Sequence, residues 1–332
     1  MGGDHAPLVN IEGAKTALTL YPQIKKIYMV GDEATLKNLC TEHGLDSARI
    51  EIKHAEDVVE MHESGASTLR SKKKSSISIA TQLVKTGEAD AVVSAGNTGA
   101  AVANAQLKLR TLLGVERAGI ASALPNEHGS CNLMDAGANP DAKPEHLLVY
   151  AVMGAVYAKD VMGARNPTVG IMSNGEEDEK GNALTKETFK LLKQVTDSGK
   201  ANFTFLGNVE GHDLFESKLD VCLCDGFTGN VVLKSVESTA KAMSKWLKLE
   251  LTRKPLRVMG AAMAKGAFKA LKSRASYETV GGSPLLGVNG VCIIAHGGSS
   301  SLAIQNALRV ACETVEKNVN PKIEQAIQEI LG

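Results

Sequence analysis

The sequence has few aromatic residues and no excess of either charge. Aromatic residues make up 4% of the 332 residues, so the core has to be built mainly from Ala, Val, Ile, Leu and Met. Lys plus Arg equal Asp plus Glu, at 37 each. Because a general nucleic-acid binder needs a basic excess to meet phosphates, this balance argues against nucleic acid as a partner.

Long apolar runs and several standard motifs are also missing. No stretch of about 18 apolar residues occurs, so no membrane-spanning helix is expected. The sequence contains no G-x-x-x-x-G-K-[ST] loop, no G-x-G-x-x-G turn and no G-x-S-x-G elbow. HESGA at 62–66 lacks the second His of a zinc helix. We therefore expect no nucleotide, no metal, no cofactor and no covalent Ser or Cys mechanism.

The cysteines give no sign of a disulfide framework. With no secretory leader in the sequence, they are expected to be reduced thiols of a cytoplasmic protein. Cys222 and Cys224 alternate within the apolar run LDVCLCD, which favours buried strand cysteines over metal ligands. The remaining four are Cys40, Cys131, Cys292 and Cys312.

Short apolar runs alternate with amphipathic segments along the chain. Strands are predicted at 26–33, 49–55, 90–97, 119–126, 132–139, 168–175, 202–211, 220–227 and 290–298. Helices are predicted at 8–20, 33–43, 76–87, 99–113, 144–162, 183–198, 228–251, 299–317 and 321–331. This pattern predicts a single α/β domain over 1–332, with a largely parallel sheet covered by helices on both faces.

Six predicted strands run directly into turns rich in Gly and Asn. The turns are SAGNTGA, DAGANPD, SNGEEDEKGN, GNVEG, CDGFTGN and AHGGSS. Such turns are common between strands and helices, but ligands of open α/β sheets also bind at the carboxyl ends of strands. Glycine lets the backbone approach a ligand, and the next helix offers free N–H groups to an anion. We therefore expect these turns to share one anion-binding rim.

The segment 236–275 departs from the alternating pattern. It holds ten Lys or Arg against only Glu237 and Glu250, and it reads as two amphipathic helices interrupted near Pro255 and Gly260. A helical arm packed on a second subunit is one interpretation. A surface for an acidic protein or an anionic lipid is the other, and the two are compatible.

Three polar residues in or beside these turns are candidates for chemistry, although each also has an ordinary structural explanation. Lys180 in GEEDEKGN is by default a solvated surface charge. Asn230 in DGFTGN is by default a helix cap. His296 in IIAHGGSS, taken alone, is more often structural.

Together these strings resemble the bacterial phosphate acyltransferase family. The resemblance covers essentially the whole chain. It rests on the order and spacing of MGGDHAP at 1–7, ADAVVSAGNTGA at 89–100, MDAGANPDAKPEHL at 134–147, GEEDEKGN at 175–182, LDVCLCDGFTGNVVLK at 219–234 and YETVGGSPLLGVNGVCIIAHGGSS at 277–300.

The resemblance implies a fold like that of isocitrate and isopropylmalate dehydrogenases and phosphotransacetylases, with the basic arm protruding. It also implies a homodimer that transfers a long-chain acyl group from acyl carrier protein to inorganic phosphate without a cofactor. Lys180 matches the catalytic lysine and Asn230 the catalytic asparagine. The residues expected to bind phosphate or substrate are Gly96, Asn97, Thr98, Gly99, Asp135, Gly181, Asn182, Gly229 and His296.

Members of the family usually begin with a short apolar strand that leads into the MGGD turn, whereas Met1 lies inside that motif here.

The chemistry follows from the substrates. Phosphate near pH 7 is a competent nucleophile toward a thioester, so the enzyme has to align two species and stabilise an oxyanion. We hypothesise that Lys180 neutralises charge while the Asn230 amide donates to the oxyanion. The product is a lipid-like acyl phosphate, so the arm is expected to contact acyl carrier protein or the anionic membrane, and the expected consumer is a membrane glycerol-phosphate acyltransferase. A cytoplasmic protein with peripheral membrane contact is the predicted localisation.

Three rival functions remain open. A phosphotransacetylase would use acetyl-coenzyme A. An isocitrate-type dehydrogenase is disfavoured, because neither a dinucleotide turn nor a set of metal-ligating aspartates is evident in the sequence. A non-enzymatic protein would bind acyl carrier protein and consume no phosphate.

Overall fold

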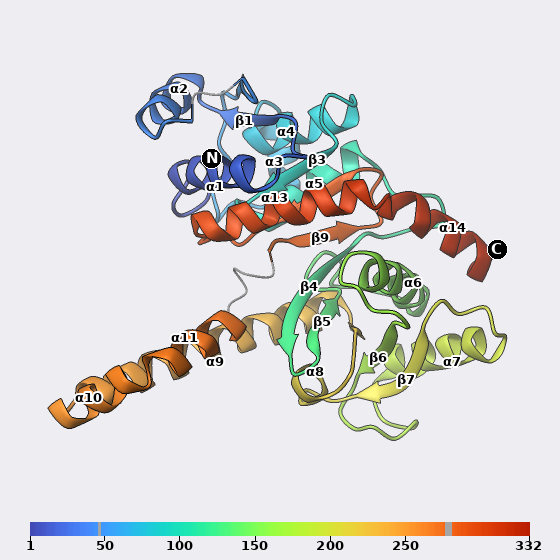
Figure 1. Ribbon diagram of the computed structural model, residues 1–332. Coiled ribbons are helices and arrows are strands. Elements are labelled where there is room, and N and C mark those ends of the chain that lie inside the picture. Colours follow the sequence, from blue (N-terminus) through green and yellow to red (C-terminus); the bar gives the residue numbers. More distant parts are fainter. Residues whose placement is uncertain (46–47, 276–280) are drawn as a thin grey trace.

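The computed structural model describes residues 1–45, 48–275 and 281–332 (Figure 1). Ten strands in the described residues form two sheets. β1 and β2 pair as a small parallel sheet, and the other eight follow the order β3-β10-β9-β4-β5-β8-β6-β7. The strands are β1 Ile27–Gly31, β2 Ile50–His54, β3 Ala91–Ser94, β4 Gly119–Asn126, β5 Gly129–Met134, β6 Thr168–Met172, β7 Thr204–Val209, β8 Val221–Leu223, β9 Ser283–Leu286 and β10 Val291–Ile294.

Helices surround the large sheet and link most of its strands. They are α1 Leu8–Leu20, α2 Glu33–Glu42, α3 Gly65–Ser71, α4 Ser76–Lys85, α5 Thr98–Lys108, α6 Pro144–Asp160, α7 Ala183–Asp197, α8 Asp213–Glu216, α9 Gly226–Thr252, α10 Pro255–Met263, α11 Lys265–Ala275, α13 Ser301–Glu316 and α14 Val319–Leu331. The α/β class with a mostly parallel, helix-covered sheet is therefore confirmed. None of the described helices has the length and apolarity that crossing a membrane requires.

The centre of the large sheet is antiparallel. β3 runs parallel to β10, and β5, β8, β6 and β7 run parallel to one another. Between these two sets, β9 pairs antiparallel with both β10 and β4, and β4 pairs antiparallel with β5. The two parallel sets therefore run in opposite directions, and their carboxyl ends leave the sheet at opposite edges.

The prediction of one shared rim is consequently wrong. Four of the six turns, those after β5, β6, β7 and β8, lie at one edge, and those after β3 and β10 lie at the other. The reversal was missed because β9 is only four residues long and contains Pro284, so it was not recognised as a strand. A hairpin at Gly129 also starts β5 earlier than the predicted 132–139.

The core beneath these turns is built from aliphatic side chains, as the composition predicts. α6 is buried along nearly its whole length against the sheet, and α7 and α14 pack beside it. The cysteines of β5 and β8 are fully buried in a second cluster. Burial raises the pKa of Cys222 well above its ordinary value, which agrees with the prediction of a structural thiol.

The predicted arm protrudes from the body. α9 starts on the sheet, extends away from it as a helix of 27 residues, and is followed at its tip by α10 (Figure 1). Arg257 of α10 forms an ion pair with Glu250 near the end of α9, which stabilises the bend just before Pro255. α10 has no buried residue. The first residues of the motif at 277–300, up to Val280, lie outside the described residues.

Candidate functional site

The turns after β5, β6, β7 and β8 form what we call the Lys180 rim, made of residues 135–139, 173–182, 210–213 and 225–230. Because these four strands are adjacent and parallel, their carboxyl ends bring the turns together. The turns after β3 and β10, residues 95–99 and 296–300, form the His296 rim together with residues 2–4.

Asp135 organises the first turn of the Lys180 rim. Its Oδ1 accepts the backbone N–H groups of Ile120, Gly137 and Ala138 at 2.9–3.0 Å, and its Oδ2 accepts that of Asn139 at 2.6 Å. The side chain is fully buried. Burial raises the pKa of the Asp135 carboxyl, while the four N–H groups oppose that shift. Both oxygens of the Asp135 carboxylate are therefore used to hold the turn together. Direct contact between Asp135 and a substrate stays a prediction, and this geometry does not support it.

Glycines allow α9 to begin directly against the Asp135 turn. A Cβ on Gly229 would lie 2.0 Å from the Asp135 carbonyl oxygen, and one on Gly226 would lie 2.7 Å from its Oδ2. Neither overlap is tolerable, so both positions require glycine. Gly229 thus permits close packing that sets the position of Asn230, and its predicted contact with phosphate or substrate stays a prediction.

Asn230 is the fifth residue of α9, at the start of its second turn, and is exposed. The cap of this helix is Asp225, whose carboxylate accepts the N–H of Thr228 at 2.9 Å and its hydroxyl at 2.7 Å. The cap explanation for Asn230 is therefore wrong. Across the described residues nothing bonds to its side-chain amide, which lies beside Gly137. That amide is available to a ligand.

Lys180 lies at the end of the loop between β6 and α7, with its side chain exposed. Four acidic residues precede it at 176–179, yet no carboxylate within the described chain pairs with its ammonium. Its backbone N–H donates to the Glu177 carbonyl at 2.9 Å, and its Cγ and Cδ lie against Gly175. The loop therefore positions the lysine through backbone and aliphatic contacts and leaves its charge unused.

Gly181 and Asn182 fix the end of this loop. Gly181 has a φ of +95°, and a Cβ there would lie 2.0 Å from the Thr185 hydroxyl, so glycine is required. Its N–H donates to the side chain of Asn174. The side chain of Asn182 caps α7 by accepting the Thr185 N–H at 3.0 Å. Their contribution is to aim the start of α7, with its positive dipole end, at the rim.

Three potential metal ligands meet at the outer part of this rim. Ligand atoms of Glu176, His212 and Asp213 lie within 4.8 Å of one another. The Asp213 carboxylate already accepts the hydroxyl of Ser217 and the N–H of Glu210. Glu176 and His212 are exposed, and the contacts of His212 with carboxylates are long, at 3.8–3.9 Å. We assign no metal to this group.

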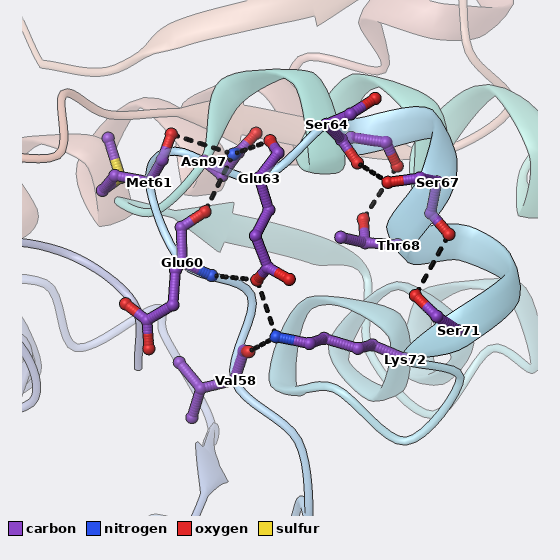
Figure 2. A network of polar contacts seen from close by, with 11 residues as sticks. Val58, Glu60, Met61, Glu63, Ser64, Ser67, Thr68, Ser71, Lys72 and Asn97 are labelled. Atoms are coloured by element: carbon purple, nitrogen blue, oxygen red, sulfur yellow. Dashed lines mark hydrogen bonds and ion pairs between the residues drawn. The ribbon is translucent and has the colours of Figure 1, made fainter.

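The His296 rim differs because its predicted asparagine is fully occupied. Asn97 caps α5 by accepting the Ala100 N–H at 2.9 Å. Figure 2 shows its Nδ2 amide donating to the carbonyls of Glu60, Met61 and Glu63 at 2.8–3.2 Å. The amide therefore holds the 60–63 segment against the turn, and a substrate contact by Asn97 stays a prediction without geometric support.

The 60–63 segment is secured by a second set of contacts. The Lys72 ammonium donates to the carboxylate of Glu63 and to the carbonyl of Val58, both at 2.6 Å (Figure 2). Gly65 packs on Gly99 so closely that a Cβ on Gly65 would lie 2.2 Å from the Gly99 carbonyl carbon. No pattern in the sequence indicated this segment or α3, because their residues are mostly polar or small and form no apolar face. Gly96 and Thr98 stay predictions; Thr98 is exposed.

His296 faces the side of α9. Its Nδ1 accepts the Gly298 N–H at 3.0 Å, which places the proton of the neutral ring on Nε2. Burial, and after it the charge of Lys234, lower the pKa of His296; Glu237 raises it and Lys241 lowers it further. His296 is therefore favoured in its neutral form.

α9 connects the two rims. Asn230 and Lys234 lie four residues apart on one helix face. The charge of Lys234 acts on His296 more strongly than those of Glu237 and Lys241, which follow it along the helix. Lys234 and Glu237 form an ion pair at 3.0 Å. Lys234 was not predicted as a site residue from the sequence. Its spacing of four residues from Asn230 could have indicated it, because residues four apart lie on the same face of a helix.

Comparisons with known proteins agree over the whole chain. The pattern of a family described as "Fatty acid synthesis protein" matches residues 1–322. A phosphate acyltransferase of Akkermansia muciniphila is 61% identical over 98% of this chain and 93% of its own length. One from Pelotomaculum thermopropionicum is 48% identical over 99% of this chain and 94% of its own length.

Solved structures show a related fold. A phosphotransacetylase of Streptococcus pyogenes matches with a TM-score of 0.54 at 16% identity, covering 91% of this chain and 98% of that one. A branched-chain phosphotransacylase of Enterococcus faecalis matches with a TM-score of 0.54 at 14% identity, covering 95% and 97%. At these identities the likeness concerns the fold alone, and it confirms the predicted similarity in fold to phosphotransacetylases.

Proposed function

Since this chain belongs to the family of fatty acid synthesis proteins, we propose that it transfers an acyl group from acyl carrier protein to inorganic phosphate. The observation that carries the proposal is a pair of polar side chains, after the neighbouring strands β6 and β8, that make no hydrogen bond or ion pair within the described residues. The Lys180 ammonium and the Asn230 amide have no partner among the described residues, and each lies beside the start of a helix. A helix start, a free cation and a free amide donor suit an anion and an oxyanion.

The proposed reaction uses these residues, the two substrates and water. A phosphate oxygen attacks the thioester carbonyl carbon, forming a C–O bond and a tetrahedral oxyanion. Asn230 donates a hydrogen bond to that oxyanion, and Lys180 offsets the combined negative charge of phosphate and oxyanion. The intermediate collapses by breaking the C–S bond, and the carrier thiolate leaves and is protonated by water. The products are acyl phosphate and free carrier protein.

The assay that tests this proposal follows acyl phosphate formed from a long-chain acyl-carrier thioester and phosphate. We expect turnover that depends on both substrates and poor turnover with acetyl-coenzyme A. Good use of acetyl-coenzyme A would favour a phosphotransacetylase instead. Binding of the carrier protein with no consumption of phosphate would favour a non-enzymatic role.

The arm provides a surface for the acidic carrier protein and for a second subunit. Large apolar side chains on α9 and α10 are exposed next to lysines; Trp246 is 60% and Met259 65% exposed. Exposed apolar area of this extent indicates an interface, and the neighbouring charges fit an acidic partner or an anionic membrane. We propose that the apolar face joins two copies of the chain and that the lysines contact carrier protein or the membrane surface, from which a membrane acyltransferase would take the product.

Charge reversal tests the arm. Lys245, Lys248 and Lys269 changed together to Glu should raise the KM for acyl carrier protein several-fold at low salt, or reduce binding to anionic vesicles, while kcat changes little. The matched control is a triple reversal of exposed lysines on the body: Lys159, Lys193 and Lys200. Equal behaviour of the two triple variants in both measurements would refute the role of the arm. Light scattering of the unaltered protein tests the dimer.

A further inference from the structure

Three buried polar side chains lie next to the Asp135 turn, in a core built mainly from aliphatic residues. They are Asn139, which ends the turn, and His146 and Tyr150 of α6, with exposed fractions of 8%, 4% and 0%. Burying such groups is unfavourable unless they form hydrogen bonds, whereas a well-bonded set of them fixes one arrangement of the chain. The hydrogen bonds of these three residues therefore show which part of the molecule they hold in place.

The main chain of Asn139 joins the Asp135 turn to the start of α9. Its N–H donates to the Asp135 carboxylate at 2.6 Å, and its carbonyl accepts the N–H of Gly226, the first residue of α9, at 3.0 Å. A Cβ on Gly226 would lie 2.9 Å from both the nitrogen and the carbonyl carbon of Asn139. The first residue of α9 therefore packs directly on Asn139.

The side-chain amide of Asn139 is held by α6. Its Nδ2 lies 3.2 Å from the His146 Nδ1 and 3.2 Å from the Tyr150 hydroxyl oxygen, so its two N–H groups can donate to both. Tyr150 donates its own hydroxyl proton to the carbonyl of Ala118, just before β4, at 3.2 Å. Asn139 is thus bonded to a buried helix and, through Tyr150, to the chain that enters β4.

His146 is oriented so that it can accept from Asn139. Its Nδ1 also accepts the Lys143 N–H at 3.1 Å, which places the proton of the neutral ring on Nε2. That Nε2 lies 3.2 Å from the Glu116 carboxylate. Contacts on both ring nitrogens therefore fix the imidazole, and with it the acceptor that Asn139 uses.

We propose that Asn139 is a positioning residue for Asn230, and that His146 and Tyr150 hold Asn139 in place. This inference rests on the proposed function, in which the Asn230 amide donates to the oxyanion. Asn230 is four residues beyond Gly226, so about one turn of helix separates it from the contact with Asn139. A shift of α9 at that contact moves the amide with it, and a misplacement of about 1 Å can cost about 10²-fold in rate.

Stabilising the core is the ordinary role of such a set of hydrogen bonds, and these residues have that role as well. Two features point beyond it. The hydrogen bonds end at the residue on which α9 starts. The Asn230 side chain, in turn, forms no hydrogen bond within the described residues, so the start of its helix has to set its position.

A double-mutant cycle tests this inference. Asn139→Ala should lower kcat about 10-fold with little change in the KM of either substrate, because the Asn230 amide stabilises charge that develops only in the transition state. In the Asn230→Ala background the same change should lower kcat little further, because the group that Asn139 positions has been removed. Steady-state rates measured well below Tm give the four values. Losses that multiply in the double variant would overturn the positioning role.

The cycle also separates this inference from the proposed function. If Asn230→Ala alone kept near-normal turnover, the role of Asn230 and its positioning by Asn139 would both fail. If Asn230→Ala lost turnover but the losses multiplied, only the positioning role would fail. Asn202→Ala is the matched control, because its amide donates to the Val152 carbonyl of α6 at 3.3 Å but lies ahead of β7, away from the Lys180 rim. It should lower stability and leave kcat unchanged.

Tyr150→Phe provides a second test, which also serves if Asn139→Ala does not fold. It keeps the buried ring and removes only the hydroxyl that receives the Asn139 amide, so kcat should fall about 3-fold at unchanged KM. Tyr157→Phe, at a second buried tyrosine two turns later in α6, is the control and should keep the parent kcat. Equal kcat values for the two Phe variants would contradict the proposal.

Discussion

The Lys180 rim and the His296 rim contain the same kinds of residue, but these residues have different roles at the two rims. At the Lys180 rim, the Asp225 and Asn182 side chains cap helices, while Lys180 and Asn230 remain unused. At the His296 rim, Asn97 makes four hydrogen bonds within the protein. The difference teaches that the turn motif alone does not identify a functional asparagine; the hydrogen bonds already made by its amide do.

The largest effect is expected at Lys180. Lys180→Ala should lower kcat about 10³-fold, because the negative charge of phosphate and oxyanion would lose its unpaired cation. Lys186→Ala, an exposed lysine one turn into α7, is the matched control and should keep near-normal turnover. Steady-state rates with acyl-carrier thioester and phosphate measure both variants, and circular dichroism checks their folding. Similar rates for the two would remove Lys180 from the mechanism.

Asn230→Ala should lower kcat about 10²-fold, the typical loss of one oxyanion donor, with little change in stability. Its neighbour Val231, which is 50% exposed, provides the control substitution Val231→Ala. Because the amide makes no bond within the described protein, any large loss of stability in Asn230→Ala would show that its role is structural.

Asn97→Ala should lower stability strongly and kcat only slightly, the opposite of Asn230→Ala. The variant loses the cap of α5 and the three hydrogen bonds that the Asn97 amide donates to the 60–63 segment, which should lower the free energy of unfolding by about 2 kcal/mol. Per folded molecule, kcat should change much less than in Asn230→Ala. Urea unfolding and turnover at a temperature well below Tm separate the two effects. If Asn97→Ala were as stable as the parent but inactive, the distinction between the rims would fail.

How far the sequence predicts this molecule depends on the length of the elements. Strands such as β6 and β7 were predicted correctly, because their apolar runs and the long helix α7 between them are clear. β9 was missed because four residues with a proline carry too little pattern, and without it the sheet appears uniformly parallel. The family motifs identified Lys180 and Asn230 as candidates. Only the three-dimensional structure shows which asparagine side chains already form hydrogen bonds within the protein.

The smallest effect concerns the protonation of His296. Its folded-state pKa lies below the ordinary value of 6.5, chiefly through burial and then through Lys234. The unfolded chain therefore binds a proton more readily than the folded one. The neutral ring favours the fold above the unfolded pKa, and this contribution is lost as the pH falls from about 6.5 through the folded pKa.

His296→Gln should flatten the dependence of Tm on pH in that interval, and Lys234→Gln should flatten it partly. His54→Gln, at the exposed end of β2, is the control substitution. An unaltered profile in His296→Gln would mean that burial at this rim does not disfavour the charged ring.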